Sequence, residues 1–279
     1  CGSYLCKTER IMQRLDQIRL ILADLDGTLL NDDKVMDTDI KQVLQERNLD
    51  ITFVTGRNRH IVSDFIEELH VVQPFIINNG AHIIQGSQCL YQRCIEQNEL
   101  EQALQVLINH ETAFLAYSDD SIYCCGQSRS LERFVTRLIG KCAIHHEKLP
   151  QQDPIFKVTV VSDDKEKMGT VMDIVNTMCP SAHLVPSEGN VYTLTHRDAT
   201  KGNAVRRLLD LLKIDASQVL AFGDNYNDIS MFEVIPNSVA MSNAEPLVLS
   251  KAAFVAGSNN ANGVSSFIRD HIQPLKTKR

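Results

Sequence analysis

Residues 21–30 are Ile21-Leu22-Ala23-Asp24-Leu25-Asp26-Gly27-Thr28-Leu29-Leu30, and an apolar run leads into them. Residues 18–23 are apolar except for Arg19, which predicts a buried strand of a parallel sheet that ends at the turn-forming Gly27. Side chains alternate along a strand, so Asp24 and Asp26 point the same way at its carboxyl end, where open α/β sheets bind ligands. Adjacent carboxylates raise each other's pKa and lose hydration, so the pair requires a cation, a proton or a reaction.

A plainer interpretation is that these acids face water in a loop, where aspartate is a common turn former and helix cap. We adopt it for Asp32 and Asp33. For Asp24 and Asp26 we do not, because Asp-x-Asp-Gly-Thr-Leu resembles the first motif of the haloacid dehalogenase (HAD) superfamily of phosphatases. The resemblance predicts that the family's other motifs follow in order at other strand ends.

Composition limits the class of protein. The chain has 279 residues, 43% hydrophobic and 23% charged, which predicts one large or two ordinary domains with a substantial core. The formal net charge of -7 disfavours a nucleic-acid surface, for which a basic stripe is expected. No apolar run approaches the ~18 to 20 residues that cross a bilayer. We therefore expect neither a nucleic acid polymer nor a membrane as partner.

The eight cysteines are scattered and include no Cys-x-x-Cys pair. This pattern favours free thiols in a reducing cytoplasm over a disulfide framework. Cys142, His145 and His146 together suggest zinc, but Cys and His without a second ligand pair are more often buried thiols and surface imidazoles. We predict no zinc site there, and we place Cys124 and Cys125 in a strand.

A second strand is predicted over residues 50–54, and Thr55-Gly56-Arg57 follows it. A hydroxyl and a glycine after a strand are common wherever a loop begins. In the HAD superfamily, however, Thr or Ser at this place is the second motif. The resemblance implies that Thr55 and Gly56 hold a phosphate oxygen, aided by a helix that begins near Asn58.

A third strand over residues 74–77 ends in Asn78-Asn79-Gly80-Ala81, and Asn-Gly is a strong hairpin signal. In the superfamily this turn resembles the Cof-type branch, where the chain leaves the core. From about residue 82 to 190, short strand-like runs alternate with helical runs, which predicts an α+β module. In place and pattern the insertion resembles the Cof-type (class IIB) cap, which excludes water and contacts the part of the substrate that is not phosphate.

The domain prediction combines these segments. We expect an N-terminal extension over residues 1–17 and an α+β cap domain over 83–190. The HAD-like catalytic core is expected over 18–82 and 191–279, as an α/β Rossmann-like doubly wound parallel sheet.

The third motif concerns a lysine. The predicted return strand over residues 191–195 leads to Thr200, which is placed to cap the next helix. Lys201 then lies in the first turn, where a cation opposes the helix dipole. The cost is only ~0.3 to 1 kcal/mol, so an ordinary solvated surface lysine would also explain this position. The family's third motif is Lys-Gly at this place, which implies that Lys201 pairs with Asp24 and holds the phosphate.

The fourth motif follows a predicted buried strand over residues 218–222. Residues 223–228, Gly-Asp-Asn-Tyr-Asn-Asp, resemble the family's Gly-Asp-x-x-Asn-Asp. Asp224 and Asp228 are four residues apart across a strand-to-helix turn, so both can converge on one cation, and oxygen ligands suit magnesium. Helix capping by Asn227 or Asp228 would explain this turn but not four motifs in the family's order.

The resemblance implies a magnesium-dependent phosphomonoester hydrolase for a small phosphorylated metabolite: a sugar phosphate, a nucleotide or a cofactor phosphate. Asp24 would attack phosphorus and form an aspartyl-phosphate. Asp26 would be the general acid and base, which requires that its pKa be raised by burial and by its neighbour. Mg²⁺ would be held by Asp24, the Asp26 carbonyl, Asp224 and, directly or through water, Asp228. The phosphoryl oxygens would be bound by Thr55, Gly56, Lys201, Asn227 and the amides of Leu25 and Asp26.

Other functions stay open. A phosphoaspartate signalling receiver uses similar residues, but it is a smaller module without an inserted cap. A silent binder of a phosphorylated ligand is disfavoured because no motif residue is missing. The motifs do not separate a hydrolase from a phosphomutase on the same scaffold.

Overall fold

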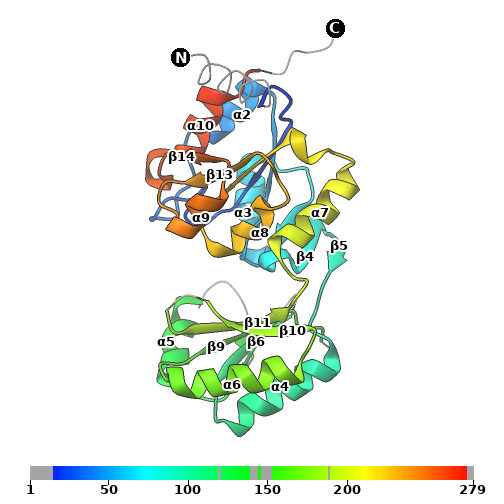
Figure 1. Ribbon diagram of the computed structural model, residues 1–279, viewed down its shortest axis with the longest axis vertical. Helices are drawn as coiled ribbons and strands as arrows, with labels where there is room; N and C mark the ends of the chain where they lie inside the picture. Colours follow the sequence, from blue (N-terminus) through cyan, green and yellow to red (C-terminus); the bar gives the residue numbers. More distant parts are fainter. Residues whose placement is uncertain (1–14, 119–120, 139–143, 146–152, 188, 275–279) are drawn as a thin grey trace. The chain divides into compact units, whose positions relative to one another are not determined.

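The computed structural model describes residues 15–118, 121–138, 144–145, 153–187 and 189–274. The chain forms two compact units (Figure 1). The first contains the chain up to Arg57, Asp64–Tyr91 and the chain from Thr200 onward, and the second contains Asn58–Ser63 and Gln92–Ala199. Of the predicted extension over residues 1–17, all but residues 15–17 lie outside the described part of the chain.

A parallel five-stranded sheet forms the centre of the first unit, in the order β14-β13-β12-β1-β2. Its strands are β1 (Leu20–Ala23), β2 (Asp50–Phe53), β12 (Val219–Gly223), β13 (Ser238–Met241) and β14 (Phe254–Ala256). The first strand lies inside the sheet with β2 on one side and β12 on the other. The chain therefore winds outward in both directions, which confirms the predicted doubly wound α/β sheet.

Helices cover both faces of this sheet. They are α2 (Ile40–Arg47), α3 (Arg59–Leu69), α7 (Lys201–Leu212), α8 (Ile229–Phe232), α9 (Pro246–Lys251) and α10 (Gly263–His271). On one face, Ala221 of β12 packs in a buried cluster with Leu208 of α7. The next residue, Phe222, points to the other face and meets Phe267 of α10 edge to face, with ring centroids 5.7 Å apart. Alternate strand residues thus bury apolar surface under helices on opposite sides.

The chain leaves the first unit for the long insertion only after Tyr91 and not, as the resemblance implied, at the Asn-Gly turn, which forms a hairpin. The turn joins β3 (Phe75–Ile77) to β4 (His82–Gln85), which pair antiparallel and form a three-stranded sheet with β5 (Gln88–Gln92). Gly80 has φ +98°, and a Cβ there would lie 2.2 Å from the carbonyl oxygen of Thr200. Only glycine allows this hairpin to approach the start of α7 so closely.

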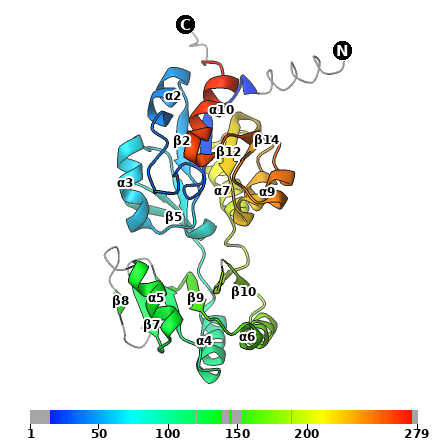
Figure 2. The same ribbon diagram turned by 90° about the vertical axis from the view of Figure 1, so that its left-hand side faces the viewer.

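The second unit contains a six-stranded sheet in the order β10-β11-β9-β6-β7-β8. Its strands are β6 (Phe114–Tyr117), β7 (Ile122–Cys125), β8 (Ile144–His145), β9 (Lys157–Val161), β10 (Ala182–Pro186) and β11 (Val191–His196). Its helices are α4 (Gln97–Asn109), α5 (Arg129–Leu138) and α6 (Lys165–Met178). Val158 of β9 lies in one buried cluster with Leu100 of α4 and Val171 of α6, so these two helices cover one face of the sheet (Figure 2).

The contacts divide the chain after Tyr91 and after Ala199, whereas the expected cap ran over residues 83–190. Two elements account for the difference. The hairpin strands β4 and β5 continue the first unit, and residues 191–195, expected to return to the core, pair as β11 between β9 and β10.

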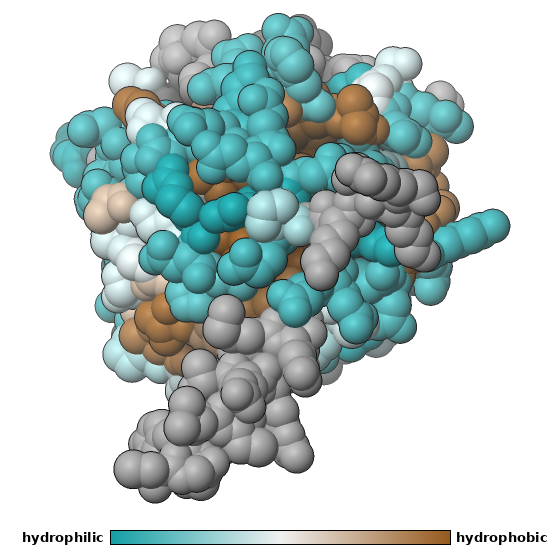
Figure 3. Space-filling view, turned by 90° about the horizontal axis from the view of Figure 1, so that it is seen from above, coloured by the Kyte–Doolittle hydropathy of each residue, from teal (hydrophilic) through white to brown (hydrophobic). Residues whose placement is uncertain are grey.

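The face of the molecule seen in Figure 3 carries no large apolar patch of described residues. Most of this face is hydrophilic, and its hydrophobic areas are small and separate. The exposed large apolar side chains among the described residues belong to many different elements: Val35, Val72, Ile108, Met178, Leu211, Tyr226, Leu247 and Val255. Of the helices that the structure describes, none has the length and apolar character needed to cross a bilayer.

The described cysteines form no disulfide with one another, and Cys124 and Cys125 lie in β7, as predicted. The predicted absence of zinc near Cys142 concerns side chains outside the described part of the chain.

Candidate active site

The end of β1 carries the first candidate residue. Asp24 follows β1 directly, is 6% exposed, and donates its backbone N–H to the carbonyl of Phe222 in β12 at 3.0 Å. The loop then closes through a bond of 2.8 Å from the amide of Leu30 to the carbonyl of Leu25, which is buried. Gly27 has φ +77°, and a Cβ there would lie 2.2 Å from Oδ2 of Asp224. Glycine at this position lets the loops after β1 and β12 approach each other.

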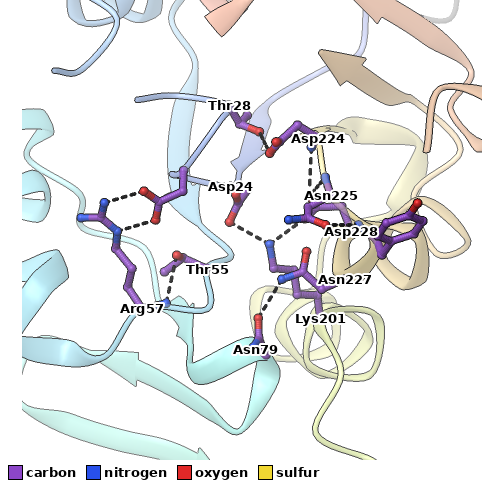
Figure 4. A network of polar contacts seen from close by, with 12 residues as sticks. Asp24, Thr28, Thr55, Arg57, Asn79, Lys201, Asp224, Asn225, Asn227 and Asp228 are labelled. Carbon is purple, nitrogen blue, oxygen red and sulfur yellow. Dashed lines mark hydrogen bonds and ion pairs between the residues drawn. The ribbon is translucent and has the colours of Figure 1, made fainter. Parts of the chain in front are cut away.

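Lys201 is the first residue of α7 and is 1% exposed. Thr200 caps the helix, as predicted, because its hydroxyl accepts the amide of Asn203 at 3.1 Å. Nζ of Lys201 donates to Oδ1 of Asp24 at 2.7 Å and to Oδ1 of Asp228 at 2.6 Å (Figure 4). Burial opposes the lysine charge, but the two carboxylates outweigh it and raise the pKa of Lys201 above its ordinary value.

Asp228 organises the loop after β12. It is fully buried, and its Oδ2 accepts the backbone N–H groups of Asp224 and Asn225, both at 3.0 Å. Oδ1 of Asp224 accepts the hydroxyl of Thr28 at 2.9 Å. With Lys201 on the other oxygen of Asp228, that carboxylate has partners on both sides and fixes the backbone that presents Asp224.

Three carboxylates converge here. One oxygen each of Asp24, Asp224 and Asp228 lies within 4.8 Å of the others. Burial raises the pKa of Asp24 to about 7, and Lys201 opposes this shift while Asp228 adds to it. Burial and Asp228 also raise the pKa of Asp224 to about 6. Crowded oxygens that resist ionisation fit a hard divalent cation, which would neutralise them, so the donor set suits Mg²⁺.

Asp26 differs from expectation. Its carboxylate accepts Nε and Nη2 of Arg57, both at 2.6 Å, and Nζ of Lys34 at 2.8 Å. Burial opposes ionisation, but these two cations outweigh it and lower the pKa of Asp26 to about 2. The expectation of a raised pKa is therefore wrong for this conformation, because charge pairing exceeds desolvation. The side chain lies with Arg57 rather than with the three converging acids.

The remaining candidates meet near Asn79. Thr55 is buried and its hydroxyl accepts the amide of Arg57 at 3.2 Å. A Cβ on Gly56 would lie 2.8 Å from Oδ1 of Asn79, and the same oxygen accepts Nδ2 of Asn227 at 2.9 Å (Figure 4). Asn79 has φ +57°, which asparagine tolerates. The sequence indicated only a hairpin there, although Asn-Gly was the signal that could have drawn attention to this residue.

Comparison with known proteins identifies a family and a fold. A family model described as haloacid dehalogenase-like hydrolase matches residues 21–268. The chain is 26% identical to 5-amino-6-(5-phospho-D-ribitylamino)uracil phosphatase YwtE of Bacillus subtilis, covering 90% of this chain and 97% of that protein. It is 25% identical to pyridoxal phosphate phosphatase YbhA of Escherichia coli, covering 91% and 98%. The solved structure of the HAD subclass IIB sugar phosphatase BT4131 matches with a TM-score of 0.76 at 19% identity, covering 90% and 98%.

Proposed function

The chain belongs to the haloacid dehalogenase-like hydrolase family, and from this premise we propose that it is a magnesium-dependent phosphomonoesterase with an aspartyl-phosphate intermediate. Its relatives are named phosphatases, and the chain is an enzyme of that superfamily. One observation carries the proposal: Asp24 and Asp224, at the ends of adjacent parallel strands, present oxygens to one point beside the buried ammonium of Lys201. Such a site can neutralise a phosphoryl group and hold a nucleophile.

Asp24 is the proposed nucleophile. Its oxygen forms a bond to phosphorus as the bond to the leaving oxygen breaks, and water later cleaves the aspartyl-phosphate and restores the carboxylate. Asp26 is the proposed general acid, which protonates the leaving oxygen and then takes a proton from that water. Since Asp26 is ion-paired with Arg57 and Lys34 here, this role requires its carboxylate to leave them and take up a proton.

The remaining roles follow the same proposal. Asp24 and Asp224 would hold Mg²⁺, with the carbonyl of Asp26 and, directly or through water, Asp228. When bound, the ion neutralises charge on the phosphoryl oxygens and on Asp24. The phosphoryl oxygens would be held by Lys201, Thr55, Gly56, Asn227 and the amides of Leu25 and Asp26.

We propose a small phosphorylated metabolite as substrate and the cytoplasm as location, with no nucleic acid polymer or membrane as partner. The names of the relatives support this class, since they specify a phosphorylated ribitylaminouracil and pyridoxal phosphate. The inserted second unit would be the cap domain.

Phosphate release from p-nitrophenyl phosphate tests the proposal. We expect steady turnover with Mg²⁺, none with EDTA, and none in Asp24→Asn, whereas Asp33→Asn, an exposed acid nine residues further on, keeps full activity. A single stoichiometric burst would instead indicate a signalling receiver, and no release from any phosphomonoester would indicate a silent binder. Isomerisation of a sugar phosphate without phosphate release would indicate a phosphomutase.

A further inference from the structure

Lys157 is the first residue of β9 in the second unit. Its Nζ lies 4.2 Å from the centroid of the Tyr117 ring. With the residues that the structure describes in this unit and elsewhere, its ammonium makes no ion pair and no hydrogen bond. Burial lowers the pKa of Lys157 to about 8. Withdrawing an ammonium from water costs free energy, and a contact with an aromatic ring offsets only ~0.5 to 2 kcal/mol of it.

The register of the sheet surrounds Lys157 with further donors. Val158 and Val160 point into the buried cluster with α4 and α6, so Lys157 points to the opposite face. There it pairs across the strands with Tyr117 of β6 and with Thr195 of β11.

The same row extends one strand further. Thr195 pairs in turn with His183 of β10. Side chains directly opposite each other on one face lie ~5 Å apart at Cβ, so the four form a continuous row. We call Tyr117, Lys157, Thr195 and His183 the Lys157 row; Lys157, Thr195 and His183 in it are partly exposed.

We propose that the Lys157 row binds a small oxyanion, either a carboxylate or a phosphate group. The row offers an ammonium, two hydroxyls and an imidazole, and none of its four members is acidic. An anion would supply the missing counter-ion, and charge-assisted hydrogen bonds would hold it. The anion is either a second charged group of the substrate, which rests on the proposed function, or a separate small molecule, which does not.

Chemical labelling of the amine tests the proposal without turnover. Asp24→Asn protein with Mg²⁺ is treated with an acylating reagent, and mass spectrometry compares Lys157 with Lys165, an exposed lysine of α6. The ligands form matched pairs, 2-phosphoglycolate against methyl phosphate and fructose 1,6-bisphosphate against fructose 6-phosphate, with malonate as a free anion.

In at least one pair, we expect the ligand with two charged groups, at saturation, to slow the labelling of Lys157 about ten- to hundredfold relative to its partner, unless malonate does so instead. The labelling rate of Lys165 should not change. Protection within a pair assigns the anion to the substrate, and protection by malonate assigns it to a separate molecule. Equal labelling of Lys157 under all conditions would overturn the proposal. Because the assay needs no catalysis, a failure of the proposed function would not mimic this result.

Kinetics give a second readout for a substrate-borne anion. We expect Lys157→Met to raise KM about ten- to hundredfold for the member of the pair that protects Lys157, with little change in kcat. The KM of the member that lacks the second charged group should change little. Lys165→Met is the matched control. If Lys157→Met changes both members of the pair equally, Lys157 has only a structural role and the substrate assignment is wrong.

Discussion

The two units each withdraw a lysine from water, but they treat its charge in opposite ways. In the first unit Lys201 lies between Asp24 and Asp228, and its pKa is raised. In the second unit Lys157 lies over the ring of Tyr117, and burial lowers its pKa to about 8. A buried charge with a counter-ion helps to stabilise the residues around it. A buried charge without one lowers the free energy of unfolding unless a bound ligand supplies the counter-ion. The predictions below test this contrast between the units.

The largest effect is expected at Asp26, the proposed general acid. Asp26→Asn removes the proposed general acid and should lower kcat about 10²- to 10⁴-fold for an alkyl phosphate, and much less for p-nitrophenyl phosphate, whose leaving group needs no proton. Asp163→Asn is the matched change in the second unit, where the carboxylate only accepts hydrogen bonds from Ser130 and Asn190. Steady-state kinetics with both substrates measure this. An equal loss for both would place the main role of Asp26 in the hydrolysis of the aspartyl-phosphate, a step that both substrates share, rather than in protonation of the leaving oxygen.

The same substitution at the two lysines should have opposite consequences for folding. Lys201→Met leaves Asp24 and Asp228 buried without their cation, and we expect the first unit to lose about 3 to 5 kcal/mol of unfolding free energy. Lys157→Met removes a charge that pairs with no acidic side chain among the described residues, so the second unit should be as stable as before or more stable. Urea unfolding followed by hydrogen exchange resolves the two units. If Lys157→Met lowered the unfolding free energy of the second unit as much as Lys201→Met lowers that of the first, the two lysines would not differ in the way we propose.

Alanine substitutions at two glycines with positive φ, Gly27 and Gly189, distinguish the cost of backbone strain from that of a steric clash. Gly189→Ala in the second unit meets open space at φ +62° and should cost only about 1 to 2 kcal/mol of strain. Gly27→Ala adds a Cβ 2.2 Å from Oδ2 of Asp224, so it should cost more and also weaken Mg²⁺ binding. Thermal unfolding with and without Mg²⁺ tests this, and equal stabilisation of both variants by the ion would contradict it.

The smallest effect concerns pH. The pKa of Asp24 is about 7 in the metal-free fold, against an ordinary value of 3.8, so the folded protein binds more protons than the unfolded chain between these values. Metal-free protein should therefore become more stable as pH falls from about 7 towards 4.

Because protons and Mg²⁺ compete for Asp24, the apparent Mg²⁺ affinity should fall about tenfold from pH 8 to pH 6. Titration calorimetry at the two pH values measures it. Affinity that does not change with pH would show that Asp24 is already ionised without the metal.

The sequence predicted the first unit well because its signals are local. The apolar runs that became β1 and β12 are uninterrupted enough to indicate buried strands, and the acids follow where each strand ends. Parallel pairing of these two strands then brings Asp24 and Asp224 together without further information.

The partners of Asp26 could not be predicted in this way. The expectation of a raised pKa rested on burial and on the neighbouring acid, but Arg57 and Lys34 reach Asp26 from two different loops. The cation that pairs with a carboxylate depends on loop conformation and side-chain rotamers. Neither leaves a periodic pattern of residues from which it could be predicted. The contact between Asn79 and Asn227 has the same character, since it requires a left-handed residue in one loop and an amide in another.

The second unit shows the corresponding limit for strands. Residues 191–195 alternate in burial, which favours a sheet with one exposed face over the fully buried strands β1 and β12, but the alternation does not specify the neighbouring strands. Only the pairing with β9 and β10 assigns the strand to the second unit, and such pairing joins residues far apart in the chain.

Lys201 has a consequence for how this protein can vary. The ammonium that pairs with Asp24, the proposed nucleophile, also ties the start of α7 to the ends of two strands. A change at this position would therefore reduce both the amount of folded protein in a cell and the rate of each molecule. Selection would act twice on one side chain, so natural variants should be far rarer there than loss of catalysis alone would require.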